Sequence, residues 1–506
     1  MKDGRRRAND ESYPSFVIRP PSFVIAMLTL GYFIETLSGQ PSPTGAGVAA
    51  QPITDVVIDS RRASAGALFV ALPGEKADGH EFVGEAFSRG AIAALVARVP
   101  EGVRCTSLDL RHGPPAGADL ERLAVPVCLI VEDPLAALQQ AATFWRARFN
   151  PRVIGITGSV GKTTTKELVA AVLEQRYRAL KSEASHNNEI GVPLTLLRLT
   201  PADQRVVLEM GMYTTGEIAQ LAAMAKPHVG VVTIIAPVHL ERAGTMERII
   251  KAKTELVRAL PPAPEGVAIL NYDDERVRGM AAATQAHAFY YGLNPAADLW
   301  ADEIESEGLE GIHFQLHFRG ETLHVRVPLL GRHSVHTALR AAAVGLVEGL
   351  TWEEIIRGLQ ASGPAQVRLV AVTGPGGAII LDDTYNASPP STIAALNLLA
   401  ELDGRRIAVL GDMLELGAYE REGHKLVGRR ARDVAEILVT VGPRARMIAD
   451  AALEVGMPPD RVKVFEDVEE AIDLLRGLVG EGDIVLVKGS RALHLERIVA
   501  ALGNGY

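Results

Sequence analysis

Residues 152–166, RVIGITGSVGKTTTK, combine a short apolar run, two glycines and a Lys-Thr pair at the start of a helical pattern. Gly158 and Gly161 let the backbone turn tightly, so that main-chain N–H groups and the positive end of the helix can face an anion. Lys162 supplies a charge for the outer phosphates of a nucleotide, and the hydroxyl of Thr163 can reach a magnesium ion. The segment therefore predicts a phosphate-binding loop.

The loop departs from the strict form of this motif. The strict spacing places the first glycine at position 156, where this chain has Ile156, and Gly155 comes one residue too early. An ordinary glycine-rich turn is the alternative interpretation. A GKTTT run after a β-branched segment is nevertheless typical of nucleotide binding, so we interpret the loop as a variant of the motif.

Other chemically capable residues follow apolar segments. Glu209 ends the segment RVVLEMG, and in a parallel sheet it would lie at the carboxyl edge, where ligands bind and where a carboxylate could hold magnesium. His239 follows the segment HVGVVTII, although a lone histidine there is more often structural. Lys253, within the helical pattern MERIIKAKTEL, has the pattern of an ordinary solvated lysine.

These residues must be positioned by a sheet. From residue 152 onwards, apolar strand-like segments alternate with helical patterns, which predicts an α/β fold with a mostly parallel sheet and helices on both faces. Further strands, GAIILDD, RIAVLGD, EILVTVG, RVKVFED and DIVLVKG, predict a doubly wound, Rossmann-like domain. A smaller α/β region, with a first helix in LTLGYFIETLSG, precedes both. We expect a disordered extension over 1–26 and domains over 27–150, 151–363 and 364–506.

Composition narrows the function classes. A chain of 506 residues with a net charge of −9 is not typical of a nucleic-acid-binding protein, so we expect no nucleic-acid partner. Cys105 and Cys128 cannot form a disulfide framework and lack metal-ligand spacing, which favours a reducing cytoplasm. The apolar stretch 23–34 is too short to cross a bilayer, so we expect no membrane partner and a folded part that begins near Met27.

Several ordered motifs together resemble the Mur ligase family. They are TGSVGKTTTKE, SHNNEIGVPLTLLRL, LEMGMYTTGEIAQLA, HLERAGTMERIIKAKTEL, LDDTYNASP and GDMLELG, and the segment IDSRRASAGALFVALPGEKADGHEFVGEAFSRGA is similar to the family's UDP-binding domain. The resemblance runs from about Met27 to near the C-terminus. It implies a small UDP-binding domain, a central ATPase-like domain with a parallel sheet and a C-terminal Rossmann-like domain.

The resemblance also implies an ATP-dependent carboxylate–amine ligase of cell-wall synthesis. ATP would phosphorylate the terminal carboxylate of UDP-N-acetylmuramoyl-tripeptide, and the amine of D-alanyl-D-alanine would then attack the acyl phosphate. ATP and Mg²⁺ are the implied cofactors, and these two small molecules are the implied partners of a monomeric enzyme. A carboxylate is a poor electrophile until phosphorylation turns one of its oxygens into part of a leaving group. Because this step brings the carboxylate and the ATP phosphates, both anions, together, magnesium and lysine charges are needed to compensate them.

Family roles carry over onto matching residues. Lys162, His239 and Lys253 would be catalytic, with Lys253 modified to a carbamate that binds magnesium beside Thr163, Glu209 and His239. The implied ATP-binding residues are Gly158, Ser159, Gly161, Lys162, Thr163, Thr164, Asn271, Arg368 and Asp383. The implied substrate-binding residues are Ser60, Arg61, Asn187, Asn188, Tyr385 and Asn386.

The chain leaves the family pattern at a few positions. Val160 stands where the family usually has asparagine, and GRHSVHT replaces an adenine-side motif that begins GRHN and has a second asparagine three residues later. Ser334 and Thr337 can form hydrogen bonds but cannot present the paired donor and acceptor of an amide. Adenine affinity or specificity is therefore the property most open to change.

Three other functions are weighed against this one. The ligase that adds a diamino residue usually carries an Asp-Asn-Pro-Arg motif, which this sequence lacks. Folylpolyglutamate synthase lacks a UDP-binding domain similar to residues 53–95. A non-catalytic, ATP-dependent switch would suit the divergent adenine motif, but it need not retain every phosphate- and metal-binding residue.

Overall fold

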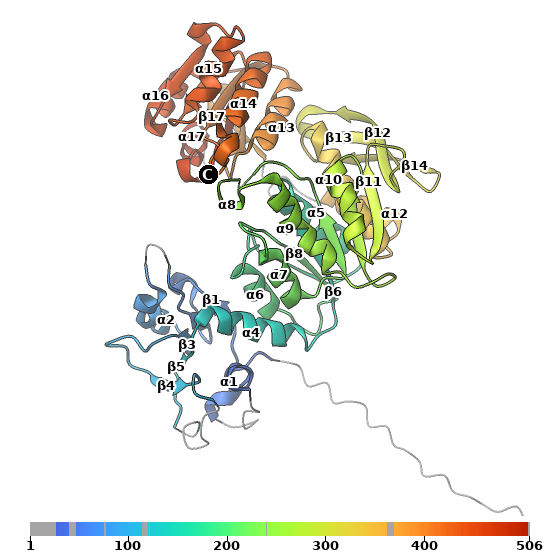
Figure 1. The fold of residues 1–506 in the computed structure, drawn as a ribbon. Helices are drawn as coiled ribbons and strands as arrows, with labels where there is room; N and C mark the ends of the chain where they lie inside the picture. The colour runs from blue at the N-terminus through green and yellow to red at the C-terminus, as the bar shows by residue number, and fades with distance from the viewer. Residues whose placement is uncertain are drawn as a thin grey trace, which may run out of the picture.

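A computed structural model describes residues 27–39, 47–74, 77–113, 120, 122–238, 240–361 and 369–503. Within these residues three β-sheets follow one another along the chain, each flanked by helices (Figure 1). This arrangement confirms the predicted α/β class. His239, Arg368 and the predicted extension over 1–26 lie outside the described residues. No helix in the described ranges is long and apolar enough to span a bilayer.

The first sheet is small and entirely parallel, with the strand order β1-β2-β3-β5-β4. Its strands and main helices are β1 (Val56–Val57), β2 (Leu68–Val70), β3 (Ala93–Val96), β4 (Thr106–Asp109), β5 (Val127–Ile130), α1 (Leu30–Ser38), α2 (Val83–Ser88) and α4 (Pro134–Arg146). The predicted first helix is α1, which begins after the N-cap Thr29 and ends at Gly39 in the left-handed region. Tyr32 anchors α1 on α4, because its hydroxyl donates to the carbonyl of Ala141 at 2.5 Å.

The central sheet carries the phosphate loop. Its order among the described residues is β14-β13-β12-β11-β10-β9-β6-β8-β7, and β13 runs antiparallel to both of its neighbours, β12 and β14, while the other pairs are parallel. Its strands are β6 (Arg152–Thr157), β7 (Ala179–Lys181), β8 (Arg205–Glu209), β9 (Val229–Val232), β10 (Val267–Asn271), β11 (His287–Gly292), β12 (Leu299–Ser306), β13 (Ile312–Phe318) and β14 (Glu321–Val327). Because β6 lies between β8 and β9, the loop after β6 and the ends of both neighbours meet at one edge.

Helices cover both faces of the central sheet. They are α5 (Lys162–Leu173), α6 (Gly191–Leu197), α7 (Glu217–Ala225), α9 (Met246–Arg258), α10 (Glu275–Arg278), α11 (Val335–Val347) and α12 (Trp352–Ala361). The short helix α8 (Leu240–Ala243) lies beside α9 and residues 417–419. Alternate residues of β6 pack on opposite sides, since Val153 joins the core beneath α6, α7 and α9, whereas Ile154 and Ile156 join the core beneath α5, α11 and α12. Both faces are therefore buried, as a parallel sheet requires.

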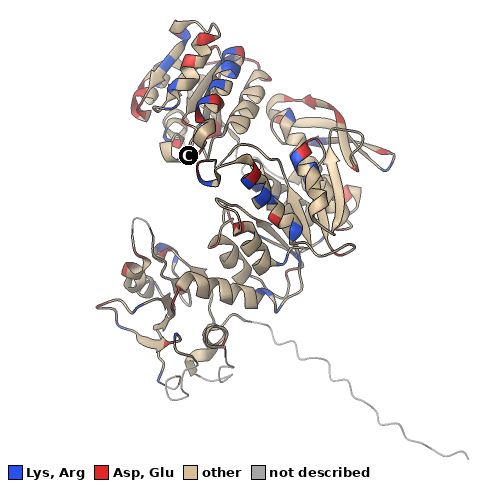
Figure 2. Cartoon of the chain, in the orientation of Figure 1, with Lys and Arg blue, Asp and Glu red and all other residues tan. Residues whose placement is uncertain are grey.

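Helix α9 is amphipathic, and its outer face carries basic residues (Figure 2). Arg248 and Lys251 are exposed, while Ile249 and Leu256 are buried against the sheet. Lys253 lies on the buried face with an exposed fraction of 2%. The sequence-based interpretation of Lys253 as a solvated lysine was wrong, because the apolar stripe of α9 includes its position.

The third sheet has the order β15-β16-β20-β17-β18-β19, with an antiparallel edge strand β15 and otherwise parallel strands. Its elements are β15 (Val370–Thr373), β16 (Ile379–Asp383), β17 (Arg405–Gly411), β18 (Ile437–Val441), β19 (Val462–Phe465), β20 (Asp483–Lys488), α13 (Pro389–Ala400), α14 (Glu420–Val434), α15 (Arg446–Glu454), α16 (Val468–Leu478) and α17 (Glu496–Leu502). Separate apolar cores lie on its two faces. The doubly wound fold and its five predicted strands are confirmed; within the described part of this domain, β15 is the one additional strand.

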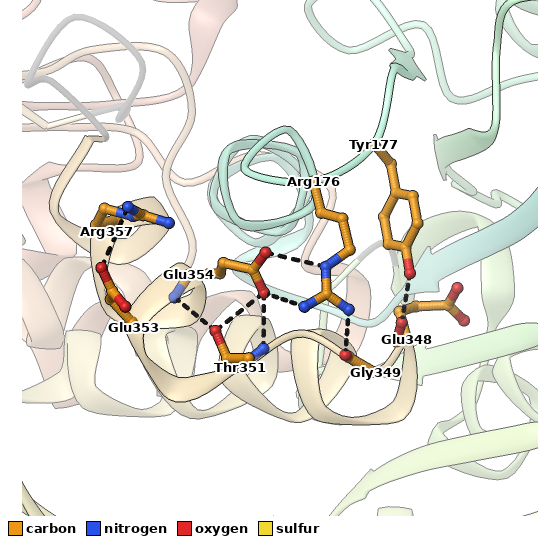
Figure 3. A network of polar contacts seen from close by, with 8 residues as sticks. All are labelled: Arg176, Tyr177, Glu348, Gly349, Thr351, Glu353, Glu354 and Arg357. Carbon is orange, nitrogen blue, oxygen red and sulfur yellow. Dashed lines mark hydrogen bonds and ion pairs between the residues drawn. The ribbon is translucent and has the colours of Figure 1, made fainter.

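A polar network joins the end of α5 to the turn between α11 and α12 (Figure 3). The guanidinium of Arg176 donates to both carboxylate oxygens of Glu354, at 2.9 and 2.5 Å, and to the carbonyl of Gly349 at 2.5 Å. The hydroxyl of Tyr177 donates to the carbonyl of Glu348 at 2.8 Å. The network fixes α12 on the helix that follows the phosphate loop.

Removal of the Glu348 carboxylate is expected to destabilise the central sheet. This side chain is fully buried and forms ion pairs with Arg152 at 2.9 Å and Arg205 at 2.6 Å. Glu348→Ala would leave these two cations without their counter-charge, so we expect the free energy of unfolding to fall by about 2–3 kcal/mol. This loss is smaller than the loss expected for a fully buried ion pair, because the Arg152 side chain is one-third exposed to solvent. Chemical unfolding followed by circular dichroism measures this loss.

Glu353→Ala is the matched control, because Glu353 is 80% exposed and pairs only at the surface with Arg357. We expect no measurable change in its unfolding midpoint. Equal midpoints for the two variants would contradict a structural role for Glu348.

Candidate active site

The loop between β6 and α5 is built around glycines. Gly158 has φ +144°, and a Cβ added there would lie 1.8 Å from Oγ1 of Thr233. Gly161 has φ +84° and precedes the first residue of α5. Only glycine fits such positions readily, so the loop brings its backbone N–H groups and the N-terminus of α5 to one place.

The segment after β9 holds the loop in this shape. The N–H of Ser159 donates to the carbonyl of Ile234 at 2.8 Å, and its hydroxyl both donates to the carbonyl of Ala236 and accepts from its N–H. Thr233 donates its hydroxyl to the carbonyl of Val160 at 2.7 Å. The family's asparagine is thus absent at Val160, but the main chain there remains anchored.

Two lysines converge on one carbonyl oxygen. The side-chain nitrogens (Nζ) of Lys162 and Lys253 each donate to the carbonyl of Gly158 at 2.9 Å. Burial, and then the nearby charge of Lys162, lowers the pKa of Lys253 well below its ordinary value. The site therefore favours a neutral amine at Lys253.

Glu209 lies at the carboxyl end of β8, as its sequence position predicted, and is fully buried. Its carboxylate accepts from the hydroxyl of Thr163 at 2.7 Å and from the amide of Asn187 at 2.8 Å. Carboxylate and hydroxyl oxygens suit a hard cation such as Mg²⁺. Among the described residues no group of three or more His, Cys, Asp and Glu side chains could hold a metal ion.

Lys166 is a site residue that the sequence-based analysis missed. It is fully buried one turn beyond Lys162, and its ammonium donates to the carbonyls of Ser182 at 2.8 Å and Ala184 at 2.6 Å. The hydroxyl of Ser182 in turn accepts from the N–H of Glu209. Lys166 thereby fixes the 182–188 loop, which carries Asn187, to the phosphate-loop helix. The sequence pattern that could have revealed it is a lysine at a position of the helical stripe whose other members are apolar.

The third sheet contributes its own strand ends. Asp383 ends β16, and its carboxylate accepts from the ammonium of Lys488, the last residue of β20, at 2.6 Å. Lys488 also donates to the carbonyl of Asn386 at 2.9 Å. The hydroxyl of Tyr385 donates to that of Ser185 in the 182–188 loop at 2.5 Å. The sequence did not single out Lys488, although this residue ends the apolar strand DIVLVKG just as Glu209 ends RVVLEMG.

Two cavities meet at these residues. The first, of about 190 Å³, lies between the phosphate loop and the third sheet, and its lining includes Thr337, Asp383 and Lys488. The second, of about 440 Å³, lies beside the 182–188 loop and reaches Lys253. Both are lined by Ser159, Lys162, Glu209 and Asn386. A phosphate in the first cavity and an acceptor in the second would meet at Lys162.

The remaining predicted residues lie around this junction or away from it. Thr164 lines the first cavity, and Asn188 lines the second and accepts from the N–H of Gly191 at 3.0 Å. Asn271 is buried and donates to the carbonyl of Thr233 at 3.5 Å; it is not among the described residues that line either cavity.

Ser60 and Arg61 lie on the first sheet's side of the molecule, away from this junction. The hydroxyl of Ser60 donates to Glu85 at 2.7 Å, and Arg61 forms an exposed ion pair with Asp59. A third cavity, of about 980 Å³, is lined by residues beside this pair, including Asp59 and Arg62, and by residues of the central part of the chain.

Comparison with known proteins identifies the family. Residues 52–113 match the Mur ligase family, catalytic domain; residues 156–345 match the Mur ligase middle domain; and residues 367–491 match the Mur ligase, glutamate ligase domain. The chain is 36% identical over 454 residues to the UDP-N-acetylmuramoyl-tripeptide–D-alanyl-D-alanine ligase of Bacillus subtilis, covering 89% of this chain and 93% of that protein. The chain belongs to the Mur ligase family. The resemblance found in its motifs is thereby confirmed.

Solved structures of Mur ligases share the fold. MurF from Acinetobacter baumannii superposes with a TM-score of 0.77 at 30% identity, covering 94% of this Mur ligase and 98% of that chain. MurF from Thermotoga maritima in complex with ADP gives a TM-score of 0.71 at 27% identity, covering 88% and 96%. As a member of this family, the chain is an ATP-dependent amide ligase.

Proposed function

We propose that the chain joins D-alanyl-D-alanine to UDP-N-acetylmuramoyl-tripeptide with consumption of ATP, in the synthesis of peptidoglycan precursors. The observation that carries this proposal is the meeting of two cavities at Lys162 and Glu209, one beside a phosphate loop and one beside the 182–188 loop. The substrates are those in the name of the Bacillus subtilis ligase, which this chain covers over 93% of its length.

The reaction divides into two steps, as the family resemblance implied. A carboxylate oxygen of the tripeptide attacks the γ-phosphorus of ATP, the bond to the bridging oxygen breaks, and ADP leaves. The amine of D-alanyl-D-alanine then attacks the acyl carbon, loses a proton, and phosphate leaves with the oxygen it acquired. Lys162, which lines both cavities, would compensate charge on the phosphoryl group during its transfer.

Magnesium fits the oxygen donors at the end of β8. Thr163 and Glu209 would hold it, and a carbamate on Lys253 would add a further carboxylate-like ligand, together with His239. Bound magnesium would neutralise phosphate charge between nucleotide and acceptor. Carbamate formation needs a neutral amine, and the buried position of Lys253 next to Lys162 supplies that condition.

The proposed binding residues divide between the cavities. The phosphate loop with Thr164, and Asp383 from the third sheet, would bind ATP in the first cavity. The family resemblance implies that Asn271 and Arg368 would also bind ATP. Asn187, Asn188, Tyr385 and Asn386 would bind the peptide in the second cavity. Ser60 and Arg61, beside the third cavity, would bind the UDP part.

We also propose that the enzyme is a cytoplasmic monomer with domains over 27–150, 151–363 and 364–506. Each proposed range contains one of the three sheets. Cys105 and Cys128 are free thiols, in keeping with a reducing compartment.

A coupled ADP-release assay tests this function. ADP formation should require both UDP-N-acetylmuramoyl-tripeptide and D-alanyl-D-alanine, and it should be absent when free diamino acids and UDP-N-acetylmuramoyl-dipeptide are supplied instead. Activity with the latter pair would indicate the diamino-acid-adding ligase. ATP binding without turnover in either mixture would favour the non-catalytic switch.

A further inference from the structure

Arg340 is a buried cation close to the phosphate loop. It lies in the middle of α11 with an exposed fraction of 4%. Its guanidinium donates to the hydroxyl oxygens of Thr165 at 2.9 Å, Thr337 at 2.7 Å and Tyr291 at 3.4 Å. Within the described ranges, no aspartate or glutamate forms an ion pair with it. All its polar partners are therefore neutral.

Burying a charge without a counter-charge is costly, so the position of Arg340 needs a physical reason. Arg146 provides a comparison within the chain, because it is also buried, at 5% exposure. Arg146 donates to three backbone carbonyls, those of Ala225, Phe149 and Pro151. Carbonyl dipoles turn their negative ends toward Arg146. The hydroxyls around Arg340 offer weaker compensation.

Arg340 is connected directly to the loop. The hydroxyl of Thr165, which accepts from Arg340, donates to the carbonyl of Gly161 at 2.6 Å. A Cβ added to Gly161 would lie 3.3 Å from Nη2 of Arg340. The N-terminus of α5 and the ammonium of Lys162 add further positive charge at the same place. A polyanion is the ligand that would balance this excess.

We propose that Arg340 is a determinant of nucleotide affinity whose counter-charge is the phosphate chain of ATP, acting from behind the loop without contact. This inference rests on the proposed ATP site in the first cavity. It also gives Thr337 a role, because this residue lines that cavity while its hydroxyl accepts from Arg340. Thr337, which stands at the position of a family asparagine, thus holds the guanidinium of Arg340 in place.

The test is the affinity of the full-length protein for ATP and for ADP, measured by calorimetry with magnesium present. At separations on the order of 10 Å and an effective dielectric constant near 20, one unit charge changes affinity roughly tenfold. We expect R340M to weaken ATP binding about tenfold and ADP binding less, because ADP carries less negative charge. R340K keeps the charge and should stay within about threefold of the unmodified protein.

R146M is the matched control, since it removes a buried arginine charge elsewhere and should leave the ratio of ATP to ADP affinity unchanged. Thermal unfolding without ligand shows whether R340M affects binding through lost charge or through lost stability. The Tm of R340M should be no lower than that of the unmodified protein, because the substitution removes a cation that has no counter-charge. Unchanged ATP affinity in R340M, or equal losses of ATP and ADP affinity in both R340M and R340K, would overturn the inference. Failure of the unmodified protein to bind ATP would instead overturn the proposed function.

Discussion

Lys162→Met is expected to lower kcat for ADP release by about a thousandfold while the protein remains folded. The ammonium of Lys162 lies 2.9 Å from the carbonyl of Gly158, where the first and second cavities meet. A cation fixed there stabilises the charge that develops on the phosphoryl group during transfer, and water cannot replace it. The coupled assay with saturating ATP, tripeptide and dipeptide measures the change.

Lys251→Met serves as the control for Lys162→Met, because Lys251 is an exposed lysine on α9. It removes the same charge and should leave kcat unchanged. A Lys162→Met variant that retains more than about a tenth of the activity would show that phosphoryl transfer does not depend on this cation.

The second large effect is expected at Lys253, where alanine substitution should reduce kcat by roughly a hundredfold or more. Short carboxylates such as formate or acetate should restore part of the activity, because they can take the place of the proposed carbamate in the space left by the side chain. The expected rescue is specific to this position, since Lys253 is buried and contacts the loop through Gly158.

Direct detection of the carbamate complements the rescue. Because burial and Lys162 lower the pKa of Lys253, its amine is neutral at a pH where an exposed lysine is still protonated, and it can react with carbon dioxide. Raising the pH through that lowered pKa should therefore increase carbamate occupancy, seen by carbon-13 NMR with labelled bicarbonate. Full activity of Lys253→Ala without added carboxylate would refute the modification, and Lys251→Ala should respond to neither treatment.

Strand ends were the part of the site that the sequence predicted well. Glu209 follows an apolar run, and parallel strands bring such residues to one edge of a sheet. Asp383, which the family resemblance implied, also ends a strand. Lys488 satisfies the same rule. It was overlooked because a terminal lysine is usually solvated, and its partner Asp383 is 105 residues away in sequence.

Buried cations were harder to predict. Ile249, Lys253 and Leu256 follow helical spacing, so the periodicity of α9 contains the signal that Lys253 faces inward. The identity of what it meets, the carbonyl of Gly158, depends on a contact across 95 residues. The same holds for Tyr385 and Ser185, whose 2.5 Å hydrogen bond joins positions 200 residues apart. Local patterns carry no information on such pairs.

The crowding at Gly158 limits how this enzyme could evolve resistance to an inhibitor. Any side chain there would collide with Thr233, at 1.8 Å from its hydroxyl oxygen, in a backbone conformation that other residues rarely adopt. The carbonyl that Lys162 and Lys253 share belongs to this residue, so it is main chain and cannot be mutated away. A compound that binds through the backbone of this loop would keep its contacts when neighbouring side chains change.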